Sequence, residues 1–301
     1  MTDAEVPSGS VVVGVDGSPA AELALGWAAD EAARRGVGLH VLHVFPWLAR
    51  ARSWEFEPPR EALEAGERMV DDAAERARAT RDGLTVTTQF LVLDPAVALV
   101  DASARGAVTV VGARGLGETG RLLGSVSQKV AAHAHGPVVV VRGRPSQPDG
   151  PVVVGMDPRD GAPEAVEYAF EEARRRGAGL TVIQGLQHEA ARRTHGAEMQ
   201  RRLAEVISRA EHQTRARLDH WRARYPDVPV ELEQVREHPV EALVAAAAHA
   251  CLVVVGSRGH SGLVSMLLGS VSRGVLLGAP VVAVVRVRHR REGGPGAGAG
   301  S

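Results

Sequence analysis

The stretch Val11-Val-Val-Gly-Val-Asp16 recurs 141 residues later as Val152-Val-Val-Gly-Met-Asp157. The likeness continues to the end of each copy, where Val110-Val-Gly-Ala-Arg-Gly115 is matched by Val254-Val-Gly-Ser-Arg-Gly259. Each copy is about 140 residues long, a usual size for one domain, and the two copies fill nearly the whole chain of 301 residues. The repeat therefore predicts two domains of the same kind in tandem.

Two segments of different composition lie outside the repeat. The stretch Gly143-Arg-Pro-Ser-Gln-Pro-Asp-Gly-Pro151 is rich in proline and is expected to be a short linker. Residues 289–301 are rich in Gly and Ala and are expected to form a flexible tail. We therefore place the first domain at residues 8–143 and the second at residues 150–288.

Short valine-rich runs alternate in each copy with longer stretches rich in Ala, Glu and Arg that have a helical period, a pattern typical of β-α-β units with a parallel sheet. The first, fourth and fifth runs are continuously apolar, as expected where helices cover both faces of a sheet. We expect an open, doubly wound, Rossmann-like α/β fold, twice. The strands are expected at about Val11–Val15, Leu39–Phe45, Thr85–Leu93, Val108–Val111 and Val138–Val141, and then at Val152–Met156, Leu180–Gly185, Val230–Val235, Leu252–Val255 and Val281–Val285.

Composition excludes several classes of function. Charged residues balance to a formal net charge of -1, so nothing in the total indicates nucleic acid or a membrane surface as a partner. The single cysteine, Cys251, can form neither an internal disulfide nor a Cys-based metal site by itself. The residues from Met1 to Ser10 lack the basic start and apolar stretch of a signal peptide. We therefore expect a cytoplasmic protein. Arginine-rich stretches such as Arg174–Arg176 are expected to be solvated.

Two features of each copy fall at the carboxyl ends of strands, where open parallel sheets bind ligands. One is the acid after the first strand, Asp16 or Asp157. The other is the glycine loop after the fourth strand, which leads to Gly124-Ser125 or Gly269-Ser270 at the start of a helix. Glycines let the backbone approach a ligand closely, and a helix N-terminus adds a positive dipole end, so both suit phosphate. A carboxylate suits the hydroxyls of a ribose, and the combination predicts a nucleotide site.

At these residues the sequence resembles the universal stress protein family, whose signature is Gly-x2-Gly-x9-Gly-(Ser/Thr) after the fourth strand. The resemblance covers both copies and implies five-stranded sheets of order 3-2-1-4-5 that bind ATP, with Mg²⁺ as its companion. In the first copy it implies a site at Gly14, Asp16 and Val44 for adenosine and at Gly112, Arg114, Gly115, Gly124, Ser125 and Val126 for the phosphates. In the second copy the matching residues are Gly155, Asp157, Gly256, Arg258, Gly259, Gly269, Ser270 and Val271.

Each copy departs from this pattern in its own way. In the second copy Gly185 stands where the first has Val44, which predicts a thinner wall for the adenine. In the first copy only eight residues separate Gly115 from Gly124, one fewer than the signature has. Arg121 lies one turn before Ser125, and two interpretations stay open: it reaches the phosphates, or it is a solvated arginine.

Three functions remain open. We favour an ATP-binding stress-response regulator, in which nucleotide occupancy modulates conformation and the binding of an unknown protein partner, with little or slow hydrolysis. The alternatives are a weak ATPase or phosphotransferase using the same pocket, and a nucleotide-free interaction scaffold. No paired carboxylates and no base are placed for acid–base catalysis, so no catalytic residue is predicted. The acids and glycines persist in both copies, which argues against the scaffold.

The fifth strands make a prediction about assembly. In the order 3-2-1-4-5 they lie at sheet edges, yet Val138–Val141 and Val281–Val285 are the most apolar strands of the chain. An exposed apolar edge invites aggregation. We therefore expect the two fifth strands to cover each other, so that the halves form an intramolecular pseudo-dimer. The family resemblance also implies that two chains could associate as a homodimer.

Overall fold

The computed structural model describes residues 5–47, 57–115, 122–157, 162–185, 197–235, 237–257 and 268–286. The predicted tail at 289–301 lies outside these residues. The first half contains β1 (Val11–Val15), α1 (Pro19–Arg35), β2 (Leu39–Phe45), α3 (Arg60–Thr80), β3 (Val86–Val92), α4 (Pro95–Ala102), β4 (Val108–Gly112), α5 (Ser125–His133) and β5 (Val138–Val141). The second contains β6 (Val152–Gly155), α6 (Pro163–Arg176), β7 (Leu180–Gly185), α7 (Ala197–Arg224), β8 (Val230–Val235), α8 (Pro239–Ala246), β9 (Leu252–Gly256), α9 (Ser270–Gly278) and β10 (Val281–Val285).

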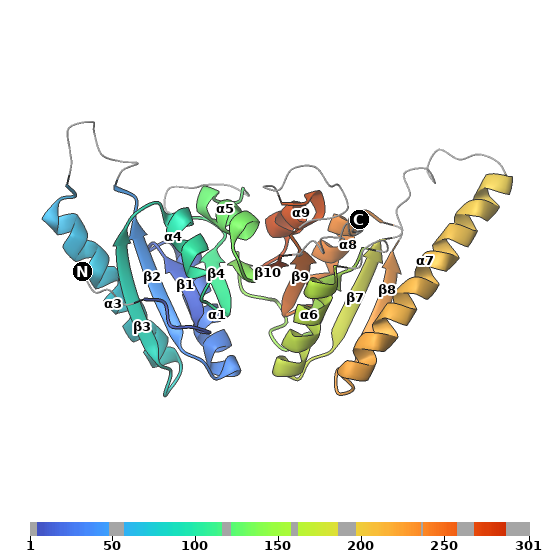
Figure 1. The fold of residues 1–301 in the computed structure, drawn as a ribbon, viewed down its shortest axis with the longest axis horizontal. Coiled ribbons are helices and arrows are strands. Elements are labelled where there is room, and N and C mark those ends of the chain that lie inside the picture. Colours follow the sequence, from blue (N-terminus) through green and yellow to red (C-terminus); the bar gives the residue numbers. More distant parts are fainter. Residues whose placement is uncertain are drawn as a thin grey trace, which may run out of the picture.

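The strands form one ten-stranded sheet of order β3-β2-β1-β4-β5-β10-β9-β6-β7-β8. Each half is parallel with the order 3-2-1-4-5, which confirms the predicted fold class. The halves meet where β5 and β10 pair antiparallel, with Val141 opposite Val281 and Val138 opposite Val284 (Figure 1). The prediction that the two fifth strands cover each other is therefore confirmed. The two halves share one continuous sheet and are not joined by the linker alone.

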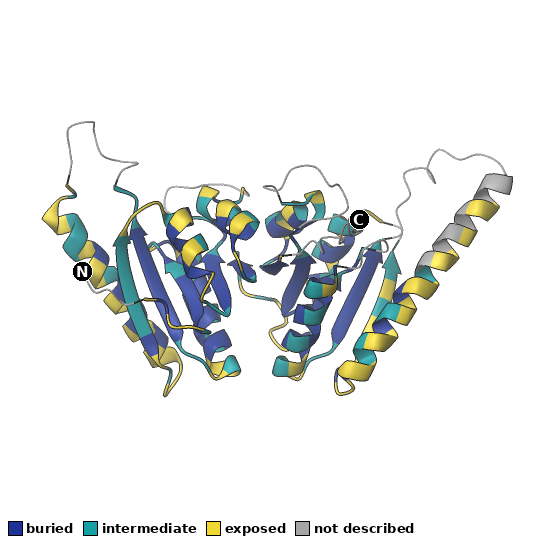
Figure 2. Cartoon of the chain, viewed as in Figure 1, coloured by how far each residue is buried: buried dark blue, intermediate teal, exposed yellow. Residues whose placement is uncertain are grey.

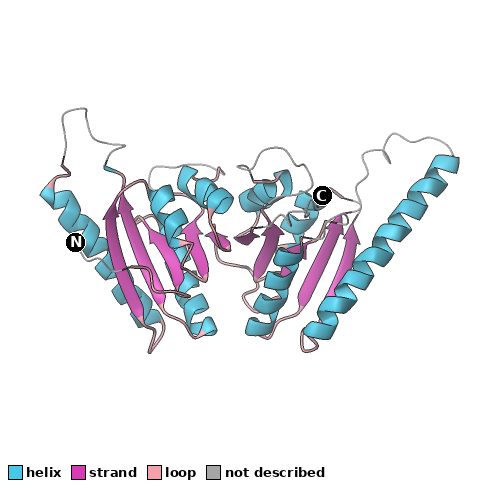
Figure 3. Ribbon diagram, in the orientation of Figure 1, coloured by secondary structure: helices cyan, strands magenta, loops and turns pink. Residues whose placement is uncertain are grey.

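Valine-rich strands form because both faces of the sheet are covered by helices (Figure 3). Along β1 the side chains alternate between two cores: Val11, Val13 and Val15 pack with α1 and α3, whereas Val12 packs on the α4 and α5 side. Each core continues from one half into the other. The central strands are buried throughout, and exposure is confined largely to helix surfaces and loops (Figure 2).

The two outer strands, β3 and β8, are protected in the same way. Arg78 in α3 donates a hydrogen bond to the carbonyl oxygen of Val86 at 3.0 Å. Arg222 in α7 donates to the carbonyl oxygen of Val230 at 3.2 Å. Each guanidinium occupies a backbone acceptor on a strand that has no neighbour on one side. In each half the arginine precedes its strand partner by eight positions, so Arg78 in α3 corresponds to Arg222 in α7.

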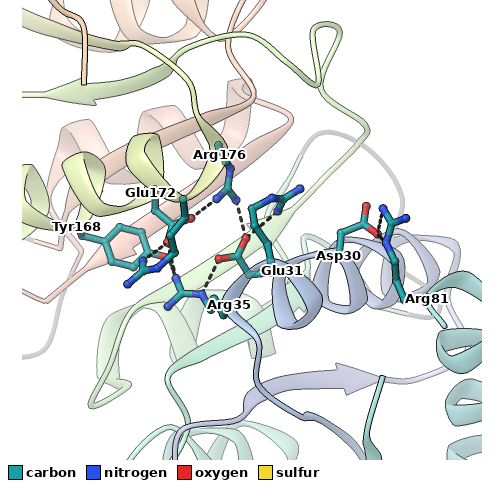
Figure 4. Close-up of polar contacts among 9 residues, drawn as sticks. Asp30, Glu31, Arg35, Arg81, Tyr168, Glu172 and Arg176 are labelled. Carbon is teal, nitrogen blue, oxygen red and sulfur yellow. Dashed lines mark hydrogen bonds and ion pairs between the residues drawn. The ribbon is translucent and has the colours of Figure 1, made fainter. Parts of the chain in front are cut away.

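A cluster of ion pairs between α1 and α6 is centred on four buried charged side chains, with Arg34 and Arg175 at its margin (Figure 4). Glu31 accepts from Arg35 and from Arg176, both at 2.6 Å, and Glu172 accepts from the same two arginines. Both carboxylates are fully buried, and the arginine side chains are at most 10% exposed. The expectation that Arg174–Arg176 is solvated is therefore wrong for Arg176, because the opposite half supplies its partner and covers it.

The electrostatics of this cluster favour ionised Glu31. Burial by itself would raise the pKa of its carboxyl, but Arg176 and Arg35 outweigh burial and lower the pKa to about 2. A carboxyl whose pKa is lower in the folded chain than its ordinary 4.5 stabilises the fold above that value. This stabilisation is lost as the pH falls from about 4.5 toward 2.

We predict that Glu31→Gln lowers the free energy of unfolding at pH 7 by about 3–5 kcal/mol, because it leaves two buried arginines to share the single carboxylate of Glu172. The matched control is Asp30→Asn, one residue away, where Asp30 and Arg81 form a half-exposed ion pair at 2.8 Å. Its loss should cost about 1 kcal/mol or less. Urea unfolding at pH 7 and pH 3 measures both variants. Equal effects of the two substitutions at pH 7 would contradict the stabilising role of the cluster.

Candidate functional site

The carboxyl ends of β1, β2 and β4 and the N-terminus of α5 surround one cavity of about 510 Å³. Its position follows from the strand order, because β1 pairs with β2 on one side and with β4 on the other. All the described residues predicted for the first site line it: Gly14, Asp16, Val44, Gly112, Arg114, Gly115, Gly124, Ser125 and Val126. Arg121 lies outside the described residues, so its two interpretations stay open.

The acid and the glycine loop meet in this cavity. A Cβ atom on Gly115 would lie 2.7 Å from Oδ2 of Asp16, so only glycine lets the loop approach the carboxylate this closely. Asp16 Oδ1 accepts from the backbone N–H of Ser18 at 3.0 Å. At Gly112, a Cβ would lie within 2.7–2.9 Å of the backbone of Ala20 and Ala21. The start of α1 therefore packs directly against the glycine loop.

The N-terminus of α5 closes the same end of the cavity. Gly124 precedes the helix without a side-chain cap, and its N–H donates to the carbonyl of Ala113 at 2.8 Å. Ser127 Oγ donates to the carbonyl oxygen of Gly112 at 2.6 Å, which fixes the helix against the loop. The first N–H groups of a helix have no partner within the helix and carry its positive dipole end. Because Ser125, Val126 and Ser127 line the cavity, this end suits an anion.

The opposite end of the cavity is apolar. Its lining includes Leu42 and Val44 of β2, Ala65 and Met69 of α3, and Leu99 of α4. Such a surface suits a flat, weakly polar ring. The cavity therefore combines an apolar surface, the Asp16 carboxylate and an anion-accepting helix end.

Three residues under the apolar end were not singled out from the sequence. His43 is buried, and its Nδ1 donates to the carbonyl oxygen of Val15 at 2.7 Å. Its ring stacks on Phe90 of β3 at 5.6 Å between centroids. Burial lowers the pKa of His43 more than Val15 and Asp16 raise it, so the imidazole is neutral at pH 7. Gly66 in α3 faces the Phe90 ring. A glycine in the middle of a helix was the sequence feature that could have predicted this close contact.

The second half places its predicted residues in corresponding positions. Gly155 ends β6 and Asp157 lies two residues beyond it, and β6 pairs with β9. Gly269 and Ser270 begin α9 as Gly124 and Ser125 begin α5. Ser272 Oγ repeats the bond of Ser127 by donating to the carbonyl of Gly256 at 2.6 Å. Two further predicted residues, Arg258 and Gly259, lie outside the described residues.

The model of the universal stress protein family matches residues 8–142 and 150–288. The chain belongs to this family. A universal stress protein of Mycobacterium tuberculosis is 36% identical over 302 residues, which cover 90% of this chain and 93% of the relative. Another from Mycolicibacterium smegmatis is 35% identical over 304 residues, covering 92% and 97%.

Solved structures show the same architecture. The crystal structure of a universal stress protein from Archaeoglobus fulgidus matches with a TM-score of 0.68 at 23% identity, covering 93% of this chain and 99% of that one. Shorter chains match a single half. One, from Archaeoglobus fulgidus in complex with dAMP, is 27% identical and covers 44% of this chain and 98% of its own, with a TM-score of 0.35. A universal stress protein in complex with cAMP is 29% identical and covers 45% and 97%, with a TM-score of 0.36.

The described residues also bear on membrane and metal binding. None of the helices in this part of the chain is both long and apolar enough to span a membrane. Within the same residues, no group of three or more His, Cys, Asp or Glu side chains could hold a metal ion.

We predict that Gly66→Ala destabilises the first half, because its new Cβ would lie 2.2 Å from the Phe90 ring. Overpacking of this kind typically costs about 1–3 kcal/mol. Gly26→Ala in α1 is the matched control, since nothing lies within 4 Å of its Cβ position and helix propensity favours alanine by roughly 1 kcal/mol. Urea unfolding should show opposite signs for the two variants. Adding Phe90→Leu to Gly66→Ala should recover stability, and failure to do so would contradict the steric explanation.

Proposed function

We propose that this chain is a cytoplasmic, ATP-binding regulatory protein in which nucleotide occupancy modulates conformation and the binding of a protein partner. One observation carries the proposal: apolar side chains, the Asp16 carboxylate and the glycine loop with the α5 N-terminus all line a single cavity. Its volume of about 510 Å³ falls within the roughly 300–1,000 Å³ of ordinary ligand pockets. The adenine, ribose and phosphates of a nucleotide offer three matching kinds of group: a weakly polar ring, hydroxyls and anions.

The residues suggest how each part of the nucleotide would be held. Val44, Met69 and Leu99 would contact the base. Asp16 would accept hydrogen bonds from the ribose hydroxyls. Backbone N–H groups of the glycine loop and of the first turn of α5 would bind the phosphates, and Mg²⁺ would be held mainly through phosphate oxygens.

Regulation is favoured over hydrolysis by the chemistry of the lining. Among the described lining residues, Asp16 is the one carboxylate and His43 the one imidazole. The Nδ1–H of His43 is committed to the carbonyl oxygen of Val15, and its ring stacks on Phe90 of β3. With Asp16 assigned to the ribose hydroxyls and His43 committed to Val15, the proposal leaves neither group to activate a water at the phosphates. A partner would instead sense the order of the loops that the phosphates contact.

We predict that Asp16→Ala weakens ATP and adenosine by similar factors, because the carboxylate acts on the ribose that both ligands share. Loss of a hydrogen bond to a charged group, about 1.5–3 kcal/mol, corresponds to roughly 10- to 100-fold in Kd. Isothermal titration with each ligand measures the two factors, and Asp30→Asn at the far end of α1 serves as the control. A loss confined to ATP would assign Asp16 to Mg²⁺ instead.

We predict that Gly115→Ala weakens ATP at least tenfold, the equivalent of about 1.4 kcal/mol. The added methyl would displace the Asp16 carboxylate from its position 2.7 Å away. Gly143→Ala is the control, because its Cβ would make an ordinary contact of 3.9 Å with Pro280. Circular dichroism checks that both variants keep the fold. Unchanged ATP affinity in Gly115→Ala would remove the glycine loop from the site.

A further inference from the structure

The two halves differ in the residues that surround the base position. Their correspondence is set by the sheet, because Leu39 pairs with Val86 as Leu180 pairs with Val230. It is set again by Arg78 and Arg222, each of which contacts the strand residue eight positions later. This register matches the following first-half and second-half pairs: Val44 and Gly185, His43 and Gln184, Ala65 and Arg209, Met69 and Gln213, Val70 and Thr214, Phe90 and Gln234, Pro95 and Pro239.

The layer beneath the base position is an aromatic stack in the first half, and its counterpart in the second half is a chain of polar side chains. In the first half a neutral His43 stacks on Phe90. In the second half Gln184 Nε2 donates to Thr214 Oγ1 at 2.5 Å, and Gln234 Nε2 donates to Gln184 Oε1 at 2.8 Å. Gln184 and Thr214 are fully buried. This chain of hydrogen bonds links β8, β7 and α7 and replaces the aromatic stack.

The wall of the pocket is also changed. Val44 contributes a side chain to the first cavity, but Gly185 has none. A Cβ at Gly185 would lie 2.7 Å from Cγ of Pro239. The proline at the start of α8 therefore occupies the space that a side chain at the end of β7 would need.

The helix that covers the base position differs as well. In α3 the cavity is lined by Ala65 and Met69. The corresponding positions in α7 are Arg209 and Gln213, both exposed. An adenine ring placed beside them would desolvate polar groups rather than bury against apolar ones, which costs free energy unless each group finds a partner.

We propose that the chain holds one adenine base, in the first half, and that the second half does not accept a base. This inference rests on the proposed function, because it assigns that function to one of two homologous halves. The second half then serves chiefly as the structural partner that covers β5 and completes the charge cluster on α1.

The first test is stoichiometry, measured on the full chain by isothermal titration with ATP. The expected result is one nucleotide per chain. Two nucleotides per chain would overturn the inference while leaving the proposed function intact. No binding at all would overturn the proposed function and the inference with it, so the two failures are distinguishable.

The second test uses matched substitutions on the surfaces of α3 and α7. Ala65→Trp fills the first cavity from an exposed helix position and should reduce ATP binding at least tenfold. Arg209→Trp makes the same change at the corresponding exposed position of the second half and should leave stoichiometry and Kd unchanged. Loss of binding in Arg209→Trp with retention in Ala65→Trp would place the base in the second half and contradict the proposal. Circular dichroism and thermal unfolding confirm that both variants are folded.

Discussion

The antiparallel pairing of β5 with β10 is the contact on which the rest of the structure depends. Both strands are wholly apolar and buried, and neither could stand as a free edge without exposing unpaired backbone groups and valines together. Their pairing turns two five-stranded sheets into one and joins the two cores across the boundary. It also places α1 beside α6, so that four charges from two helices become mutual partners.

Both ends of α1 are fixed by contacts with other segments. The N-cap residue, Ser18, has a side chain that accepts from the N–H of Ala21 and donates to the carbonyl of Arg114 in the glycine loop. The helix ends at Arg35, which contacts Glu172 of the other half. Buried charges are costly unless each is paired, so the helix can dock on α6 only in the register that pairs them. A single helix therefore connects the candidate nucleotide site to the interface between the halves.

Tandem duplication within one chain explains how the halves came to differ. The two identical chains of a homodimer share every substitution. Two copies within one chain can acquire substitutions independently. The sheet, the strand ends and the helix starts are common to both halves because each half needs them to fold. The layer between β2 and α3, and its counterpart between β7 and α7, has diverged. His43 and Phe90 form an aromatic stack in one half, and Gln184 and Gln234 form a hydrogen-bonded pair in the other.

The sequence by itself determined the tandem repeat, the α/β class and the strand positions to within a residue or two. The convergence of Asp16 with the glycine loop was expected from the strand order that the family resemblance implies. The repeat, the fold class and the strand positions follow from local patterns, because each hydrophobic run and each glycine or acid at a strand end lies within a short segment of the chain. Only the tertiary structure decided that Arg176 is buried by the other half, that Phe90 lies beneath His43, and that Pro239 occupies the space beside Gly185. Each of these contacts joins residues that are distant in the sequence. The residues next to them in the chain therefore do not reveal which segments pack together.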